Sequence, residues 1–472
     1  MPDIRYLCLS DLHFGAQTSL LTNLKTASSE LDCTQPSPVL VQLVECLKDL
    51  ISQNHNKTIK PTLILNGDIL EFALVEDNEA AMVFERFIDL ILPEGNELFE
   101  RIIYIPGNHD HHLWETARET QYVDYLSTIG WGQNIPAPWH ATNIFNSPKP
   151  LASYFLTRMV RRIPRLKDWT IETAYPNFGV RSEVEPKCVI FHHGHLVESM
   201  YTIMSTLKTM LFPGREMPTD VWDLEKENFA WIDFFWSTLG RSSGVVGYIY
   251  EKLQDMKQVK KLLANLSNGL AKKYDLPGWG DRVEAKFLDW AFEAVANKIG
   301  SLERNNPDTV LSKDSEEGLR TYMQGPLRKQ LLGECENTVP ANVTFVFGHT
   351  HKPFQEGKTF DGYSEWVNVY NTGGWVVDTI DRQPLHGGAV VLIDENLDAT
   401  SLHMYNEADK VGDYVVRVQE ARHPGDLPSP FHDRIEGLVD YSPDLWKNFS
   451  EIVAQAVNDL AQDLHTRVDG PG

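Results

Sequence analysis

Five short clusters hold histidine, aspartate and asparagine side chains at spacings that suit metal chemistry. In chain order they are Asp11-Leu12-His13, Gly67-Asp68, Gly107-Asn108-His109-Asp110, His192-His193-Gly194-His195 and Gly348-His349-Thr350-His351. Carboxylates, imidazoles and amide oxygens are the ligands that manganese, iron, zinc, cobalt and nickel accept in proteins. The clusters therefore predict a transition-metal site.

The spacing within the first and last clusters suits two ligands on one metal. Asp11 and His13 are two positions apart, as are His349 and His351, and alternate side chains of an extended chain point to the same side. The second to fifth clusters each contain a glycine, namely Gly67, Gly107, Gly194 and Gly348. Glycine lets the backbone turn sharply beside a bound phosphate. Each motif alone is weak, because a lone Asp-x-His or Gly-Asp is more often a surface turn. The ordered set is far more specific.

Short apolar runs of the kind that form buried strands lie at or just before the clusters. They cover residues 4–9, 62–65, 102–105, 189–191 and 343–347. Helical patterns lie between the early runs, and one begins at Ser37-Pro38 with an N-cap residue and a proline at the first helical position. Strands that alternate with helices predict a layered α/β core.

Two stretches between the clusters are too long for simple connections, since loops typically run about 4–6 residues. We expect residues 113–187 and 197–340 to be inserted caps, the second of them helical. The remaining ranges are then 1–112 for the first part of the core, 188–196 for a core strand with its metal loop, 341–412 for the last part of the core and 413–472 for a C-terminal helical extension.

Composition limits the partners and the compartment. The net charge of −23 would repel nucleic-acid phosphates, so a nucleic-acid partner is disfavoured. No apolar run approaches the roughly 18 residues that a membrane span needs. Five scattered cysteines without C-x-x-C spacing suit reduced thiols, and the segment that begins at Ile4 lacks the pattern of a signal peptide. We therefore expect a cytoplasmic protein.

The five clusters together resemble the motifs of the calcineurin-like metallophosphoesterase superfamily, in which D-x-H, G-D, G-N-H-[DE], H and G-H-x-H each follow a strand. The match covers the core and skips both insertions. The resemblance implies an α/β fold, a four-layer sandwich of two mixed β-sheets flanked by helices, with large, mainly helical cap insertions. It also implies two divalent metal ions, with Mn²⁺ as the first candidate and Fe, Zn, Co or Ni as the others.

The resemblance also implies a role for each matching position. The first metal takes Asp11, His13 and His351, the second takes Asn108, His193 and His349, and Asp68 bridges the two. His109 matches the histidine that faces the scissile phosphate without binding a metal. The fourth cluster offers His192, His193 and His195, and we choose His193 because the family ligand is usually the histidine directly before a glycine. His195 is the main competitor for that position.

Several neighbouring residues keep two interpretations. Glu71 stands where the family often has an acid that pairs with the catalytic histidine, which would orient His109 and raise its pKa. The alternative for Glu71 is a solvated residue at a helix start. By alternation along its strand, His192 should be packed and hydrogen-bonded, whereas His111 and His112 either line the pocket or begin a helix.

The function that the resemblance implies is hydrolysis of a phosphomonoester, phosphodiester or pyrophosphate by a hydroxide held between the two metals. The residues after Asp68 lack the Asp-Arg-Gly sequence of serine/threonine phosphatases and the tyrosine of purple acid phosphatases. The combination of Gly-Asp-x-x-Glu with Gly-His-Thr-His-Lys-Pro is similar to the bacterial branch that includes UDP-diacylglucosamine pyrophosphatases, although those chains are much shorter. A small phosphorylated substrate is the expected partner.

Two alternatives stay open. The basic stretch 158–167 beside apolar residues 151–156 would suit an enzyme that works at a membrane surface on a phospholipid or nucleotide-lipid pyrophosphate. A solvated or acid-paired surface explains the same stretch more simply. The other alternative is a catalytically silent scaffold with the same fold. Such a scaffold should have lost a ligand or His109, and this chain has a residue of the right type at every position.

Overall fold

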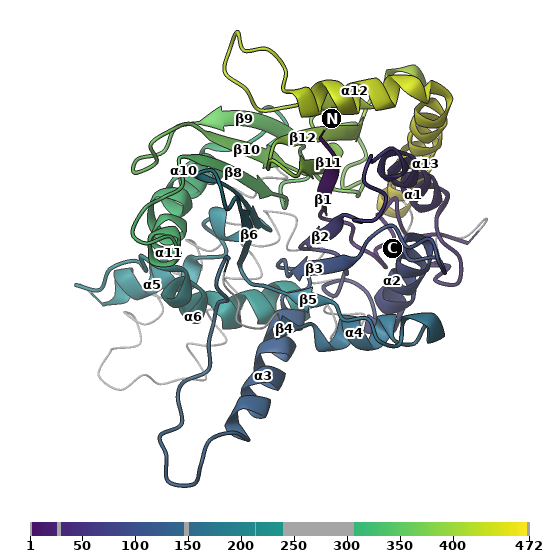
Figure 1. Cartoon of the computed structure of the whole chain (residues 1–472). Helices are drawn as coiled ribbons and strands as arrows, with labels where there is room; N and C mark the ends of the chain where they lie inside the picture. The colour runs from purple at the N-terminus through teal and green to yellow at the C-terminus, as the bar shows by residue number, and fades with distance from the viewer. Residues whose placement is uncertain (1, 26–29, 146–150, 213, 239–305, 470–472) are drawn as a thin grey trace.

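The computed structural model describes residues 2–25, 30–145, 151–212, 214–238 and 306–469. Within this part of the chain, two mixed β-sheets form the centre of the molecule (Figure 1). The larger sheet has eight strands in the order β13-β12-β11-β1-β2-β3-β5-β4, and the smaller has five in the order β6-β7-β8-β10-β9.

The strand bounds are as follows. The larger sheet contains β1 Ile4–Leu9, β2 Thr62–Asn66, β3 Arg101–Ile105, β4 Leu151–Ala152, β5 Glu172–Thr173, β11 Gly387–Asp394, β12 Ala399–Asn406 and β13 Arg417–Gln419. The smaller sheet contains β6 Asn177–Arg181, β7 Lys187–His192, β8 Asn342–Phe347, β9 Phe354–Lys358 and β10 Val367–Asn371.

Parallel pairing brings the five clusters to one edge of the sandwich. β1, β2 and β3 run parallel to one another, and β7 runs parallel to β8. The clusters follow the carboxyl ends of these five strands. Between the sheets, Ile64 and Ile103 of the larger one pack with Phe191 and Val346 of the smaller one in a buried apolar cluster. Burial on both faces explains why these strands are nearly continuous apolar runs.

Helices cover the outer faces of both sheets (Figure 1). Those that pack on the larger sheet include α1 Pro38–Ser52, α2 Asp77–Ile91, α4 Tyr154–Val160, α12 Pro430–Tyr441 and α13 Pro443–Asp469. On the side of the smaller sheet lie α5 Ile203–Leu211, α6 Val221–Trp231, α10 Lys313–Tyr322 and α11 Arg328–Glu334, while α3 His112–Leu126 projects from the body. Short helical turns occupy Pro164–Leu166, His195–Val197, Ile232–Thr238, Met323–Leu327 and Val411–Asp413. The four-layer α/β sandwich predicted from the sequence is confirmed.

The start of α1 shows how local sequence sets these elements. Ser37 caps the helix by accepting a hydrogen bond from the amide of Leu40 at 3.0 Å, and Pro38 occupies the first turn, as its sequence predicts. The apolar face of α1, which includes Leu43 and Leu47, is buried against the larger sheet.

The long stretches between the clusters do more than cover the core. Residues 113–187 contribute β4 and β5 to the edge of the larger sheet and β6 to the edge of the smaller one. Within residues 197–340 the structure describes the helices α5, α6, α10 and α11, together with non-helical stretches such as 214–220 and 306–312, and residues 239–305, with the helical pattern at 283–295, lie outside the described residues. The range 413–472 is mainly helical but also supplies β13. Among the described helices, none is long and apolar enough to cross a membrane.

Candidate metal centre

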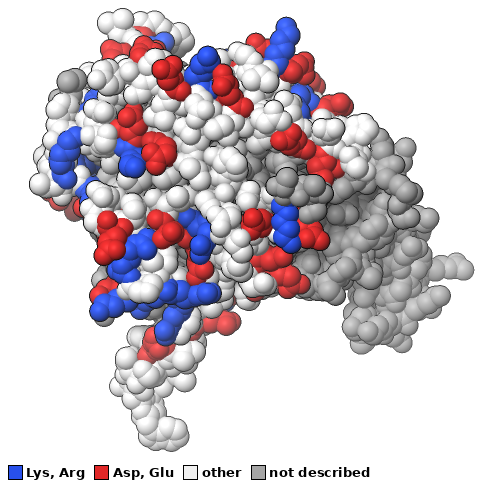
Figure 2. Space-filling view, turned by 90° about the vertical axis from the view of Figure 1, so that its right-hand side faces the viewer, with Lys and Arg blue, Asp and Glu red and all other residues white. Residues whose placement is uncertain are grey.

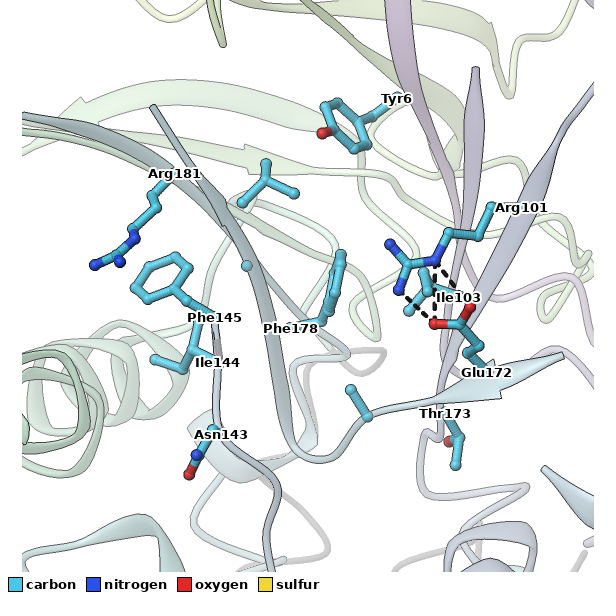
Figure 3. A pocket seen from close by; sticks show the side chains of 13 residues that line it. Tyr6, Arg101, Ile103, Asn143, Ile144, Phe145, Glu172, Thr173, Phe178 and Arg181 are labelled. Atoms are coloured by element: carbon cyan, nitrogen blue, oxygen red, sulfur yellow. Dashed lines mark hydrogen bonds and ion pairs between the residues drawn. The ribbon is translucent and has the colours of Figure 1, made fainter. Parts of the chain in front are cut away.

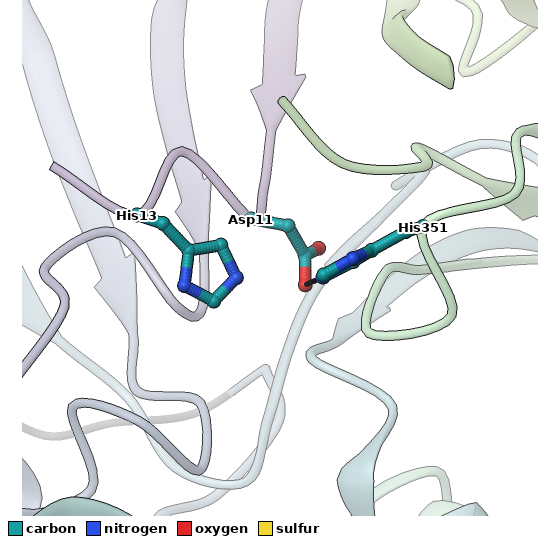
Figure 4. Close-up of side chains that lie close together, drawn as sticks. All are labelled: Asp11, His13 and His351. Carbon is teal, nitrogen blue, oxygen red and sulfur yellow. Dashed lines mark ion pairs between the residues drawn. The ribbon is translucent and has the colours of Figure 1, made fainter. Parts of the chain in front are cut away.

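The loops after β1 and β8 bring together the first group of candidate ligands. Asp11, His13 and His351 each offer one ligand atom, and these atoms lie within 4.8 Å of one another. The Asp11 carboxylate is 3.6 Å from His351 Nε2, and Figure 4 shows the three side chains turned toward a common point. Asp11 is fully buried, and the His13 and His351 side chains are only 4% and 16% exposed. A cation here would meet one carboxylate and two imidazoles.

The loops after β2, β3, β7 and β8 form a second group. Asp68, His193 and His349 also offer ligand atoms within 4.8 Å of one another. His193 Nε2 lies 3.2 Å from Asp68 Oδ2 and 3.1 Å from the amide oxygen of Asn108. The second group thus contains a carboxylate, an amide oxygen and two imidazoles.

Asp68 lies between the two groups. Its Oδ2 is 3.2 Å from His193 in the second group and 4.0 Å from His13 Nε2 in the first. Its Oδ1 accepts a hydrogen bond from the amide of His109 at 2.8 Å. One carboxylate is therefore within reach of two neighbouring cations.

The backbone at these positions is strained. Eight non-glycine residues in the described part of the chain have positive φ, and five of them are candidate ligands: Asp11, His13, Asp68, His349 and His351, with φ between 46° and 73°. Each residue held in this left-handed region costs about 1–3 kcal/mol, and such strain gathers at functional sites. Packing alone does not explain why positive φ is concentrated at the candidate ligands. A requirement to point their ligand atoms toward a common cation would explain it.

Residues 4–214 match the family model described as calcineurin-like phosphoesterase. The chain carries a calcineurin-like phosphoesterase domain. The protein is therefore a metal-dependent phosphoesterase, and the matched family implies a centre of two divalent metals. No curated protein matches the chain. The cluster that contains His349 and His351 lies beyond the matched range, and the fold of the phosphoesterase brings it beside Asp11.

Outer hydrogen bonds orient the imidazoles of the phosphoesterase. His193 Nδ1 donates to the carbonyl of Asn66 at 3.1 Å, while Nδ1 of His13 bonds Glu71 at 2.8 Å and Nδ1 of His351 bonds Asp378 at 2.7 Å. Acceptors on Nδ1 fix the tautomer that leaves Nε2 free to bind a cation. His13 Nε2 is buried and has no hydrogen-bond partner among the described residues, as expected for an atom that faces a metal.

The electrostatics of the site favour positive charge. Burial lowers the pKa of His193, but the carboxylates of Asp68 and Asp11 outweigh burial and raise that pKa to about 9. Burial also lowers the pKa of His351, and Asp378 and Asp11 raise it to about 10. In each case carboxylates surround a buried imidazole. A pair of divalent cations would satisfy the same negative charge.

Glu71 links His109 to the centre. Its Oε1 bonds His109 Nδ1 and its Oε2 bonds His13 Nδ1, both at 2.8 Å. Burial raises the pKa of Glu71, but its two histidine partners outweigh burial and bring the pKa down to about 2. Glu71 is therefore a buried carboxylate that holds two histidines. His109 stands beside both groups with 14% of its side chain exposed, so a substrate can reach it.

The fourth cluster divides its three histidines between different surroundings. His193 faces Asp68 and Asn108. His195 turns away and bonds the hydroxyl of Tyr175 through Nε2 at 2.9 Å. His192 is fully buried and packs against Tyr322, with ring centroids 4.7 Å apart. Its nitrogens have no hydrogen-bond partner in the described part of the protein, so the expected hydrogen bond of His192 is not found there.

Two acidic residues contact candidate ligands, and neither contact was predicted from the sequence. Asp378 follows β10 in an irregular segment, so no strand or motif placed it beside His351. Glu198 Oε2 lies 3.5 Å from His349 Nε2 and follows the fourth cluster by three residues. Its position after that cluster was a signal that could have been used.

A third residue, Asp110, belongs to a recognised cluster but had no role. Its carboxylate accepts hydrogen bonds from the amides of Gly107 at 2.7 Å, Ile69 at 2.8 Å and Leu70 at 3.2 Å. Asp110 therefore fastens the loop after β3 to the loop after β2.

A pocket of about 300 Å³ lies elsewhere, where β3 and β5 approach β6 (Figure 3). Its lining includes Tyr6, Phe178 and Arg181, and also Arg101, which pairs with Glu172 through its Nε at 3.0 Å. Arg101 begins β3, whereas the metal loop follows the other end of that strand. None of the candidate ligands lines this pocket, so it is separate from the metal centre.

Proposed function

We propose that the protein uses two divalent metals to hydrolyse a phosphomonoester, phosphodiester or pyrophosphate of a small molecule. The observation that supports this most strongly is the pair of candidate ligand groups with Asp68 between them. The backbone has positive φ at five of these candidate ligands. In this proposal Asp11, His13 and His351 hold the first metal and Asn108, His193 and His349 hold the second, with Asp68 shared between them.

The chemistry follows from what each part can supply. When bound, paired divalent metals provide a nucleophilic water at neutral pH and neutralise charge on the phosphoryl group. The chain holds these cations by five imidazole or amide groups and two carboxylates, a mixture that suits Mn²⁺, our first candidate, as well as Fe, Zn, Co or Ni. His109 faces the scissile phosphate from outside the ligand groups and protonates the leaving oxygen or offsets its charge. Glu71 orients the His109 ring.

We favour a small phosphorylated substrate over a lipid surface. Within the basic stretch 158–167, Arg162 pairs with Glu85 at 3.0 Å and Arg165 pairs with Asp89 at 2.7 Å. In Figure 2 basic side chains gather near the lower left of the face with acidic ones beside them, and such pairing gives little support for docking on anionic lipid. The net charge of −23 also weighs against nucleic acid. We propose a cytoplasmic location, with which free thiols such as buried Cys46 and Cys188 agree.

A substrate and metal screen tests the proposal. Purified protein is assayed with p-nitrophenyl phosphate and bis-p-nitrophenyl phosphate in the presence of Mn²⁺ and of the other divalent candidates, and the metal content of untreated protein is measured in parallel. We expect turnover that a chelator abolishes and Mn²⁺ restores. Absence of turnover with every metal would favour the catalytically silent scaffold.

A further inference from the structure

A fully buried carboxylate from the second insertion lies behind the metal centre. Glu225 belongs to α6 and is 0% exposed. Its Oε1 is 2.9 Å from His111 Nε2, and its Oε2 accepts a hydrogen bond from the hydroxyl of Tyr175 at 3.0 Å. Both carboxylate oxygens are therefore occupied by polar partners from other parts of the chain.

These two partners lead to the two loops that carry second-metal ligands. His111 follows Asn108 by three residues in the loop after β3. Tyr175 donates its proton to Glu225, so its oxygen accepts a hydrogen bond from His195 Nε2, which lies at 2.9 Å. His195 follows His193 by two residues in the loop after β7. Glu225 thus ties one loop directly and the other through Tyr175.

The link to His111 is an ion pair. Burial lowers the pKa of His111, but Glu225 and Asp233 outweigh burial and raise it to about 10. Asp233 Oδ1 lies 3.8 Å from His111 Nδ1 and belongs to the helical turn that continues from α6. Removal of one member of a buried ion pair leaves the other charge uncompensated, which is strongly unfavourable. The position of His111 therefore depends on the inserted segment.

A third metal is the competing explanation for this cluster, because His111, Glu115 and Glu225 offer ligand atoms within 4.8 Å of one another. The partners of these carboxylates argue against a third metal. Glu225 Oε1 lies at a hydrogen-bond distance of 2.9 Å from His111 Nε2, and Glu225 Oε2 already accepts a hydrogen bond from Tyr175. Glu115 is also already paired with Arg118.

We propose that Glu225 is a positioning residue through which the second insertion fixes the loops of Asn108 and His193, and thereby sets the affinity of the second metal alone. The inference rests on the proposed function, because it takes Asn108 and His193 as ligands. The first-metal histidines have different anchors, namely Glu71 for His13 and Asp378 for His351. A change at Glu225 should therefore weaken one metal and spare the other.

Two single-site backgrounds allow the test. His351→Ala removes a first-metal ligand and leaves the second site, whereas Asn108→Ala leaves the first. Glu225→Gln is introduced into each background and into the wild type, and Mn²⁺ binding to the chelator-treated full chain is titrated by electron paramagnetic resonance. Glu227→Gln is the matched control, since Glu227 lies on the same helix but pairs with Lys208.

The expected result is selective. Loss of a residue that orients a metal ligand typically lowers affinity about 10–100-fold. Glu225→Gln should lower Mn²⁺ affinity by about tenfold or more in the His351→Ala background and leave it unchanged in the Asn108→Ala background. Tyr175→Phe removes the hydroxyl that joins Glu225 to His195 but keeps the pair of Glu225 with His111, and should give a smaller loss in the same background. This second variant keeps the test usable if Glu225→Gln does not fold.

Three results would overturn the inference. Equal losses in both backgrounds would indicate a general effect on folding, and no loss in either would remove the role of Glu225. A third Mn²⁺ ion per wild-type chain that disappears in Glu225→Gln would make Glu225 a ligand. Failure of the proposed function looks different, because the wild type itself would then bind no Mn²⁺.

Discussion

At the scale of single residues, the centre is defined as much by hydrogen-bond acceptors as by ligands. Glu71, Asp378 and the carbonyl of Asn66 each hold the Nδ1 side of one candidate ligand imidazole, and Glu71 also holds Nδ1 of His109. The Glu71 carboxylate is buried and that of Asp378 is partly exposed, and both add negative charge next to the candidate ligands. This arrangement explains why a cluster with several histidines favours cations.

His109 gives the sharpest prediction at this scale. His109→Asn should keep the metal content nearly intact but lower kcat about 10²–10⁴-fold, as expected when a general acid is removed. Alkyl phosphates should suffer more than aryl phosphates, because a basic leaving oxygen needs the proton and an acidic phenol does not. Metal analysis and kcat with both kinds of ester provide the measurement.

Two other outcomes would change the role of His109. An equal loss with both kinds of ester would point to charge stabilisation of the phosphoryl group. Loss of a metal ion from His109→Asn would make His109 a ligand, and the assignment of the Gly107-Asn108-His109-Asp110 cluster would then be wrong.

At the scale of elements, the strand ends were the predictable part of the site. Each cluster stood beside an apolar run, and parallel pairing of β1 with β2 and of β7 with β8 follows from the α/β pattern. Asp378 could not be placed in this way, because it lies in an irregular segment. The bond from Glu225 to His111 joins residues 114 positions apart, and no local pattern encodes such a contact.

The loops after β2 and β3 approach each other closely at Gly107, so a substitution there tests whether the site needs Asp68 in its present position. A Cβ at Gly107 would collide with the carboxylate of Asp68, although the backbone there does not have positive φ. Gly107→Ala should therefore displace Asp68 and reduce occupancy of both metals, measured by metal analysis of the purified variant. Gly412→Ala is the control, because a Cβ at Gly412 meets no atom within 4 Å. Unchanged metal content in Gly107→Ala would show that Asp68 does not need its present position.

A second contact between elements lies far from the metals. Asp3, just before β1, accepts hydrogen bonds from the amides of His55 at 2.7 Å and Asn56 at 2.8 Å, and pairs with Arg434 of α12 at 2.9 Å. Burial raises the pKa of Asp3, but these backbone and side-chain partners outweigh burial and hold the pKa well below its usual range.

This contact predicts a defined dependence of stability on pH. The folded-state pKa of Asp3 is lower than its unfolded value of about 3.9, so its contribution is fully present above that value and is lost as pH falls toward the folded pKa. The free energy of unfolding should therefore be lower in Asp3→Asn than in the wild type at pH 6–7, and the difference should shrink below about pH 4. Urea unfolding of both proteins across this range measures it. A difference that stays constant with pH would contradict the ion pair.

At the scale of the whole molecule, the chain combines a core that its motifs predict with insertions that they do not. The layered α/β core follows from strand and helix periodicity, whereas the four-layer sandwich was implied by the resemblance to the calcineurin-like superfamily. The contributions of β4, β5 and β6 to the sheets were hidden, because two of these strands are only two residues long and none has a motif beside it. Substrate identity depends on surfaces around the centre, for which the sequence offers no motif with a known mechanism.

The central claim is that one carboxylate serves two metals, and metal analysis of Asp68→Asn tests it most directly. The wild type should hold two divalent ions per chain, and the variant should lose occupancy at both sites because Asp68 reaches both ligand groups. His112→Asn is the control, since His112 is 40% exposed and pairs with Asp233 instead. We predict a large loss of metal in Asp68→Asn and little or none in His112→Asn. Two fully occupied sites in Asp68→Asn would contradict the account.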